Sequence, residues 1–167
     1  GGVTKAAELH TKGIAKWTID YNPLEAAPAS GHDKVVVKDT LGPGIEPYLT
    51  SDFKLDTAAL TSSDSTPRFN IQAMTLNSDG SVRATGDNLA PQWITEGRVT
   101  YDPSSRELKI ELPDGKQPYQ ITYLTVLTGE SGDKITNNVA VEGVTVKQSG
   151  DSASYTIQNS DASASEF

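Results

Sequence analysis

Apolar side chains alternate with polar ones in one short segment after another along this chain of 167 residues. In KWTIDYN (16–22), Trp17, Ile19 and Tyr21 alternate with threonine, aspartate and asparagine. Successive side chains of a β-strand point to opposite faces, so this period of two predicts strands with one buried face. Such strands become stable by packing sheet on sheet, because each sheet must bury its apolar face against another element.

The same pattern predicts strands along most of the chain. Turn-forming residues such as GPG (42–44) separate the segments, and PSS (103–105) is a short hairpin loop. Short strands separated at regular intervals by turns are typical of an all-β sandwich. The other expected strands are KVVVKDTL (34–41), RVTYD (98–102), RELKIELP (106–113), YQITYLTVLT (119–128), KITNNVAVEGVTVKQ (134–148) and ASYTIQN (153–159).

Residues 50–97 interrupt this pattern and are interpreted as a large insertion between core strands. Within them LDTAALTSS (55–63) suggests one or two helical turns, and FNIQAMTLNSDGSVRAT (69–85) suggests a weak hairpin. We expect one domain over residues 1–159. The low-complexity end SDASASEF (160–167) is expected to be a disordered tail or a cloning scar.

Charge and composition exclude several classes of function. The chain has 22 acidic and 14 basic residues, a net charge of −8 and a pI near 4.7. Nucleic acid is therefore not an expected partner, because binding it depends on Lys and Arg neutralising phosphates. No apolar run approaches the ~20 residues of a membrane span, so we expect no membrane insertion by this segment.

The absence of cysteine excludes disulfides, thiolate metal sites and cysteine nucleophiles. The sequence also lacks the motifs of hydrolases, zinc proteases and phosphate-binding loops, so we expect no enzyme, no metal and no cofactor. A cysteine-free chain rich in Ser, Thr, Asp, Asn and Gly is common among extracellular proteins of Gram-positive bacteria. We therefore interpret the chain as a piece of a larger extracellular protein.

Three polar residues share the strand parity of buried aliphatic neighbours. Asn137 has the parity of Ile135 and Val139, Asp39 follows Val35 and Val37, and Lys5 follows Val3. Each has an ordinary structural explanation: Asp39 as a cap of the following turn, Lys5 as a solvated terminal lysine, Asn137 as a partner of a nearby loop. A buried carboxamide without partners costs a few kcal/mol, however, so its position needs an explanation.

Together these three residues suggest a specific reaction. Burial lowers the pKa of a lysine and raises that of an aspartic acid, so both become neutral in an apolar core. A neutral amine is a nucleophile, and a protonated carboxyl can polarise a carboxamide. Lys5, Asp39 and Asn137 at contact distance can therefore form an amide between side chains, with loss of ammonia.

These segments resemble a known family. VTK (3–5), KWTIDYN, KVVVKDTL, YQITYLTVLT and ITNNVAV (135–141) are together similar to the Ig-like N2-type domain of Gram-positive surface adhesins. This collagen-adhesin (CnaA-type) family forms intramolecular isopeptide bonds. Around its reactive asparagine the family has an apolar residue, a spacer, Asn, a spacer and a small residue, and here Val139 takes the last place. The resemblance covers about residues 3–159.

The resemblance implies an Ig-like β-sandwich of the variant adhesin type. It also implies that Lys5 and Asn137 are bonded and that Asp39 promotes the reaction. Asn138, one residue out of register, and Lys12 or Lys16 remain alternative members of the bonded pair. The only turnover expected is this single intramolecular reaction.

The function implied is that of an adhesion or stalk domain on a cell-wall-anchored bacterial surface protein or pilus, with the anchor outside this segment. The expected partners are a host extracellular-matrix protein or glycan and neighbouring Ig-like domains of the same chain. The alternative is a carbohydrate-binding module of a secreted or surface protein. In that case Trp93 is the candidate ligand-binding residue, as an aromatic ring that stacks on a sugar.

Overall fold

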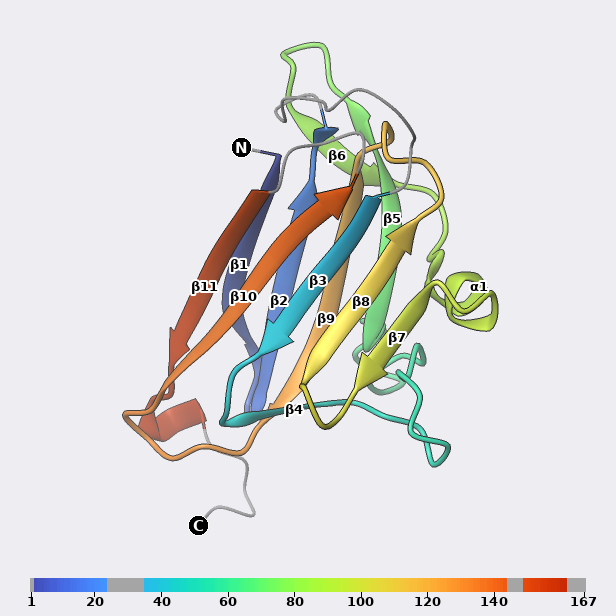
Figure 1. The fold of residues 1–167 in the computed structure, drawn as a ribbon. Helices are drawn as coiled ribbons and strands as arrows, with labels where there is room; N and C mark the ends of the chain where they lie inside the picture. Colours follow the sequence, from blue (N-terminus) through green and yellow to red (C-terminus); the bar gives the residue numbers. More distant parts are fainter. Residues whose placement is uncertain (1, 24–34, 144–148, 162–167) are drawn as a thin grey trace.

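The fold is a sandwich of two antiparallel sheets, seen in a computed structural model that describes residues 2–23, 35–143 and 149–161 (Figure 1). Sheet A has the strand order β1-β2-β9-β5-β6, with β4 pairing to β9, and sheet B has the order β11-β10-β3-β8-β7. The strands are β1 (Val3–Thr11), β2 (Ile14–Tyr21), β3 (Val35–Leu41), β4 (Ile45–Pro47), β5 (Phe69–Leu76), β6 (Val82–Thr85), β7 (Val99–Asp102), β8 (Glu107–Leu112), β9 (Tyr119–Leu127), β10 (Lys134–Gly143) and β11 (Ser149–Thr156). The predicted all-β sandwich is confirmed.

The inward parity predicted from the sequence matches the buried side chains. In β2 every second residue is buried, and Trp17, Ile19 and Tyr21 are fully enclosed. In β3 the buried positions are Val35, Val37, Asp39 and Leu41. The last residues of the expected strand 134–148 and Lys34 lie outside the described residues.

Residues 50–97 were interpreted from the sequence as an insertion between core strands. In the structure this segment contributes to the core. Its β5 pairs with β9 in sheet A, and Phe69 and Ile71 are 1% and 0% exposed. The hairpin expected in 69–85 is confirmed as β5 and β6. The helical turns expected in LDTAALTSS are wrong, because this stretch forms bends and isolated bridges such as Ala59 to Pro67.

A short helix, α1 (Ala90–Thr95), follows β6 and begins with a proline in its first turn. It buries Ala90 and Trp93. Within the described ranges, no helix has the length and apolar character needed to cross a membrane.

The two sheets meet along β1 and β11, which lie side by side at one edge of the sandwich (Figure 1). There the backbone N–H of Lys5 donates to Asp151 Oδ2 of β11 at 2.8 Å. This contact fixes the start of β1 against sheet B, and so positions the Lys5 side chain between the sheets.

The C-terminal boundary differs from the expected one at residue 159. A 3-10 helix, η2 (Asn159–Asp161), follows β11, and Asp161 is 3% exposed. The Tyr155 hydroxyl donates to the Asp161 carboxylate, and the backbone oxygen of Asp161 accepts from Gly13 N–H. The domain therefore extends at least to Asp161, and the rest of the expected tail, 162–167, lies outside the described residues.

Candidate functional site

Four polar side chains meet between the two sheets: Lys5 of β1, Asp39 of β3, Tyr123 of β9 and Asn137 of β10. We call them the polar cluster. The side chains of Lys5 and Asp39 are 0% exposed, and Tyr123 and Asn137 are 3% and 0% exposed. Two of the strands belong to sheet A and two to sheet B, so the polar cluster connects the two layers of the sandwich.

Tyr123 is the centre of the hydrogen bonds in the polar cluster. Its hydroxyl donates to Asp39 Oδ2 and accepts from Lys5 Nζ at 3.0 Å and from Asn137 Nδ2 at 3.1 Å. Lys5 Nζ also contacts Asp39 Oδ1 as a buried ion pair. The amine of Lys5 and the carboxamide of Asn137 therefore share one oxygen atom, next to a carboxyl group.

Strand register explains why these residues meet. In sheet B, Asp39 pairs with Val139 and Leu41 pairs with Asn137, so Asp39 and Asn137 are diagonal neighbours on the inner face. In sheet A, β2 lies between β1 and β9, and its Trp17 pairs with Tyr123. Alternation then directs all four side chains into the same layer.

Aromatic rings surround the amine. Lys5 Nζ lies 5.5 Å from the centre of the Trp17 ring and 5.2 Å from that of Tyr123. Burial lowers the pKa of Lys5, and the nearby Asp39 carboxylate opposes this effect. Burial, followed by the Asp39 charge, raises the pKa of Tyr123 well above its usual value. The site therefore makes the amine easier to deprotonate and keeps the phenol neutral.

The carbonyl oxygen of Asn137 has its own hydrogen-bond donor. The backbone N–H of Gly42 donates to Asn137 Oδ1 at 2.9 Å. Arg106 holds this turn by donating from Nε to Leu41 O at 3.2 Å and from Nη2 to Gly42 O at 3.0 Å. A backbone donor on this oxygen is suited to the negative charge that develops when a nucleophile attacks the carboxamide.

Gly42 is required for this close approach. A Cβ atom at Gly42 would lie 2.1 Å from the backbone oxygen of Thr136, which is fixed in β10. Only glycine allows the turn after β3 to come this close to the strand that carries Asn137.

The residues weighed as alternatives lie outside the polar cluster. Asn138 is exposed on the outer face of β10, and Lys12 is exposed in the turn between β1 and β2. Lys16 is directed away from the core, and its Nζ lies 3.6 Å from Glu8 Oε1. The geometry therefore brings together Lys5, Asp39 and Asn137 of the predicted residues.

Tyr123 was not predicted from the sequence, and direct contact was expected between Asp39 and the carboxamide. The structure places the Tyr123 hydroxyl between them. Its inward parity with Tyr119 and Ile121 was visible in YQITYLTVLT, and a buried tyrosine hydroxyl needs a partner. The sequence did not show that this hydroxyl, on sheet A, lies against Asp39 and Asn137 of sheet B.

Trp93 is not available to stack on a sugar, which corrects the interpretation of this residue as a ligand contact. Only 5% of it is exposed, and its ring packs edge-on against Tyr119 with centroids 5.1 Å apart. Its apolar surface is already buried against the sandwich, because α1 folds back onto the neighbouring strands.

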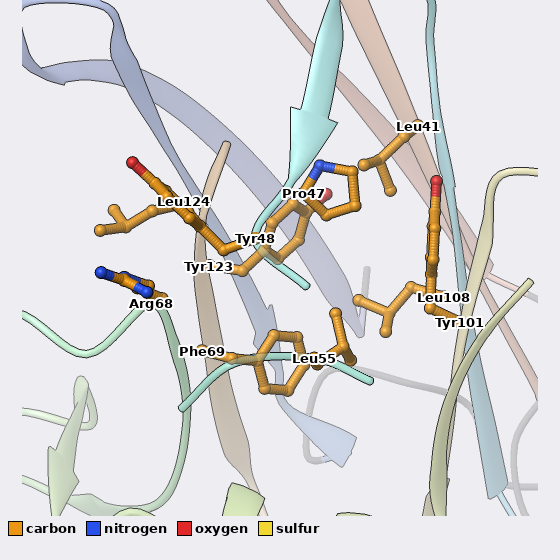
Figure 2. A pocket seen from close by; sticks show the side chains of 10 residues that line it. All are labelled: Leu41, Pro47, Tyr48, Leu55, Arg68, Phe69, Tyr101, Leu108, Tyr123 and Leu124. Atoms are coloured by element: carbon orange, nitrogen blue, oxygen red, sulfur yellow. The ribbon is translucent and has the colours of Figure 1, made fainter. Parts of the chain in front are cut away.

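A small cavity lies beside the polar cluster, and Figure 2 shows its mostly apolar lining, which includes Tyr123, Phe69 and Leu108. Its volume is about 10 Å³, which is about the space that one water molecule needs. A second pocket of about 190 Å³ is lined by residues that include Phe53, Ile94 and Tyr101. The small cavity is therefore a gap in the packing, too small for an organic ligand.

The fold is similar to those of several solved adhesin structures. The collagen-binding domain from a Staphylococcus aureus adhesin is 16% identical, with a TM-score of 0.52 over 94% of this chain and 95% of that one. The S. aureus collagen adhesin is 14% identical, with a TM-score of 0.56 over 92% of this chain and 49% of that one. The collagen binding domain of Erysipelothrix rhusiopathiae surface protein RspB is 12% identical, with a TM-score of 0.52 over 94% and 50%.

This chain spans about half the length of the latter two structures. The sequence matches no family model and no curated protein. The similarity to the three structures extends over nearly the whole sandwich. The chain therefore has the Ig-like fold of Gram-positive collagen-adhesin domains, and the resemblance drawn from its sequence is confirmed at the level of the fold.

Proposed function

We propose that Lys5 and Asn137 form an intramolecular isopeptide bond and that Asp39 promotes its formation. The bond joins Lys5 Nζ to Asn137 Cγ, the bond from Cγ to Nδ2 breaks, and ammonia leaves. The observation that carries this proposal is the contact of both nitrogen atoms with the Tyr123 oxygen, beside the buried Asp39 carboxyl.

Each residue has a role suited to its surroundings. Asp39 accepts a proton from Lys5 Nζ, because desolvation disfavours the charged amine. The neutral amine then attacks the Asn137 carboxamide, whose oxygen is held by Gly42 N–H. Orientation of the two reactants in one rigid site replaces a bimolecular encounter, which accelerates such reactions by a large factor.

We further propose that the domain serves adhesion or forms part of a stalk on a bacterial surface protein or pilus. Two of the similar structures are the collagen-binding domain of a Staphylococcus aureus adhesin and that of an Erysipelothrix rhusiopathiae surface protein. A host extracellular-matrix protein is therefore the proposed class of ligand, and neighbouring Ig-like domains are the proposed partners within the chain. The proposed location is the bacterial surface, where the protein is anchored to the cell wall.

A crosslink from β1 to β10 suits such a role. It joins the first strand of sheet A to a strand of sheet B, so tension applied at the two ends passes through a covalent bond. The part of the chain between Lys5 and Asn137 is then protected from being extended by this tension. The bond would act as a disulfide does, in a chain without cysteine.

Intact-protein mass spectrometry tests the bond. We expect the wild-type chain to be lighter than its sequence by one ammonia, and a tryptic digest to contain a branched peptide joining the two segments. Asp39→Ala should restore the full sequence mass while the sandwich remains folded. Asn138→Ala is the matched control, because this exposed neighbour should leave the loss of ammonia unchanged. A wild-type mass equal to the sequence mass would disprove the bond.

Single-molecule stretching from the two ends tests the stalk role. The wild-type domain should release only the chain outside the crosslink. Asn137→Ala should release the enclosed residues as well, at about 3.3 to 3.6 Å for each residue. Equal extensions of the two proteins would exclude the load-bearing role, even if mass spectrometry had found the bond.

A further inference from the structure

The phenol of Tyr123 occupies a position that the reaction described above leaves without a role. We propose that Tyr123 is a catalytic proton relay, which carries a proton from the attacking nitrogen of Lys5 to the leaving nitrogen of Asn137. This proposal rests on the proposed isopeptide bond. Its oxygen lies 3.0 Å from Lys5 Nζ and 3.1 Å from Asn137 Nδ2.

A relay is needed because the leaving nitrogen must gain a proton. An amide nitrogen leaves as ammonia only after protonation, and the attacking nitrogen must lose a proton to become an amide. Asp39 contacts Lys5 Nζ and the Tyr123 hydroxyl through its two oxygens. The hydrogen bond of Asn137 Nδ2 is made to the phenol, so the phenol is the group placed to protonate it.

The steps balance without any further reactant. Lys5 Nζ first gives one proton to Asp39 Oδ1, and the neutral amine attacks Asn137 Cγ. The new C–N bond forms as the carbonyl electron pair moves to Oδ1, opposite Gly42 N–H. The phenol then passes its own proton to Nδ2 and takes one from Nζ as the bond from Cγ to Nδ2 breaks. The products are the amide, ammonia, a neutral phenol and a protonated Asp39.

The surroundings of Tyr123 hold the phenol in place for this transfer. Its ring stacks on Phe69, with centroids 6.2 Å apart and an interplanar angle of 21°. Its hydroxyl donates to Asp39 Oδ2 before the reaction begins. Protonation of Asp39 removes the charge that holds this hydrogen, so the hydroxyl is released to turn towards Nδ2. The first proton transfer thus prepares the second.

Tyr123→Phe removes the hydroxyl and keeps the ring. The full chain would be made by cell-free synthesis, with a short pulse of isotope-labelled amino acids to mark newly made protein. The loss of ammonia from the labelled protein would then be followed over time by intact-protein mass spectrometry. A positioned acid–base group contributes about 100-fold to 10,000-fold to a rate, so we expect crosslinking to slow by at least about 100-fold. Tyr21→Phe is the matched control: it removes a buried hydroxyl, bonded to Gly115 O, from another part of the core and should leave the rate unchanged.

A second measurement separates proton transfer from packing. Replacing Tyr123 alone with a ring-fluorinated tyrosine keeps the hydroxyl and nearly the same shape but makes the phenol more acidic. A relay that protonates the leaving nitrogen predicts faster crosslinking, whereas a structural role predicts the wild-type rate. This measurement also decides the question if Tyr123→Phe does not fold.

The outcomes distinguish this proposal from the one on which it rests. If the wild-type chain loses ammonia and Tyr123→Phe does so at the same rate, the relay is overturned and the isopeptide bond stands. If the fluorinated chain reacts at the wild-type rate, the relay is likewise overturned. If the wild-type chain keeps its full mass, both proposals fail together.

Discussion

The ion pair of Lys5 and Asp39 lies between the two sheets, whereas two other pairs involve the segment before β5. All three join a basic to an acidic side chain, but their surroundings differ. Lys5 and Asp39 have side chains that are 0% exposed. Arg68 and Asp56 are 26% and 20% exposed, and His10 and Asp64 are 18% and 31% exposed. In the first pair desolvation lowers the pKa of Lys5, whereas solvent screens the other pairs.

We call residues 48–68 the outer segment. Its Asp64 lies 2.7 Å from His10 of β1, although β4, which directly precedes the segment, pairs with β9 on the other side of β2. Leu124, which has the parity opposite to Tyr123, is 1% exposed, and its N–H donates to Arg68 O at 2.9 Å. The contact of Asp64 with His10 and the backbone hydrogen bond of Arg68 with Leu124 thus hold the outer segment against sheet A, whereas the polar cluster places reactive groups in contact.

The largest effect should come from breaking the proposed bond itself. Asn137→Ala removes the electrophile, so the chain between Lys5 and Asn137 is no longer a closed loop. Closing so long a loop stabilises a fold by about 4 to 5 kcal/mol in the disulfide model. We expect a loss of about this size in denaturant unfolding. Asn138→Ala should change stability by less than about 0.5 kcal/mol, and an equal loss in both variants would contradict the bond.

The next effect concerns the point where the outer segment joins the core. Phe69→Ala removes a ring that is 1% exposed and stacks on Tyr123, and cavities of this kind cost about 3 to 5 kcal/mol. Phe53→Ala is the control, because Phe53 is 75% exposed in the same stretch of chain. Similar unfolding midpoints for the two variants would show that this stretch lies outside the core after all.

A smaller effect is expected for the ion pair within the outer segment. Arg68 Nη1 contacts Asp56 Oδ2 at 2.5 Å, and the guanidinium lies 4.7 Å from the centre of the Tyr48 ring. Partly exposed contacts of these kinds contribute about 1 kcal/mol. Arg68→Met should therefore lower stability by about 1 kcal/mol and leave the loss of ammonia unchanged. A change in crosslinking would show that the outer segment controls the polar cluster.

The smallest effect is a dependence on pH. Hydrogen bonds from Thr66, followed by the contact with His10, lower the pKa of Asp64 in the folded state. A carboxyl with a lowered pKa stabilises the fold above its unfolded pKa of about 3.9, and this contribution is lost as the pH falls through the folded pKa. Thermal unfolding should therefore show a shallower acid loss in Asp64→Asn than in wild type. Parallel curves would show that Asp64 does not contribute.

Much of the site was predictable because strand alternation is a local property. The inward parity of Asp39 and Asn137 follows from valine and isoleucine neighbours two residues away. The segment 50–97 was harder, because β5 reads as a weak strand by itself. Its burial depends on pairing with β9, which lies far along the chain. β4 was missed for a similar reason, since three residues carry too short a pattern.

The sequence by itself determined the class of fold, the inward face of the main strands and three members of the polar cluster. Only the tertiary structure decided that Tyr123 is the hub of the cluster, that Gly42 N–H meets the carboxamide oxygen, and that Trp93 is buried. The physical reason is the range of the interactions. Alternation acts between neighbours along one strand, whereas these contacts depend on how two sheets pack and how loops return to them.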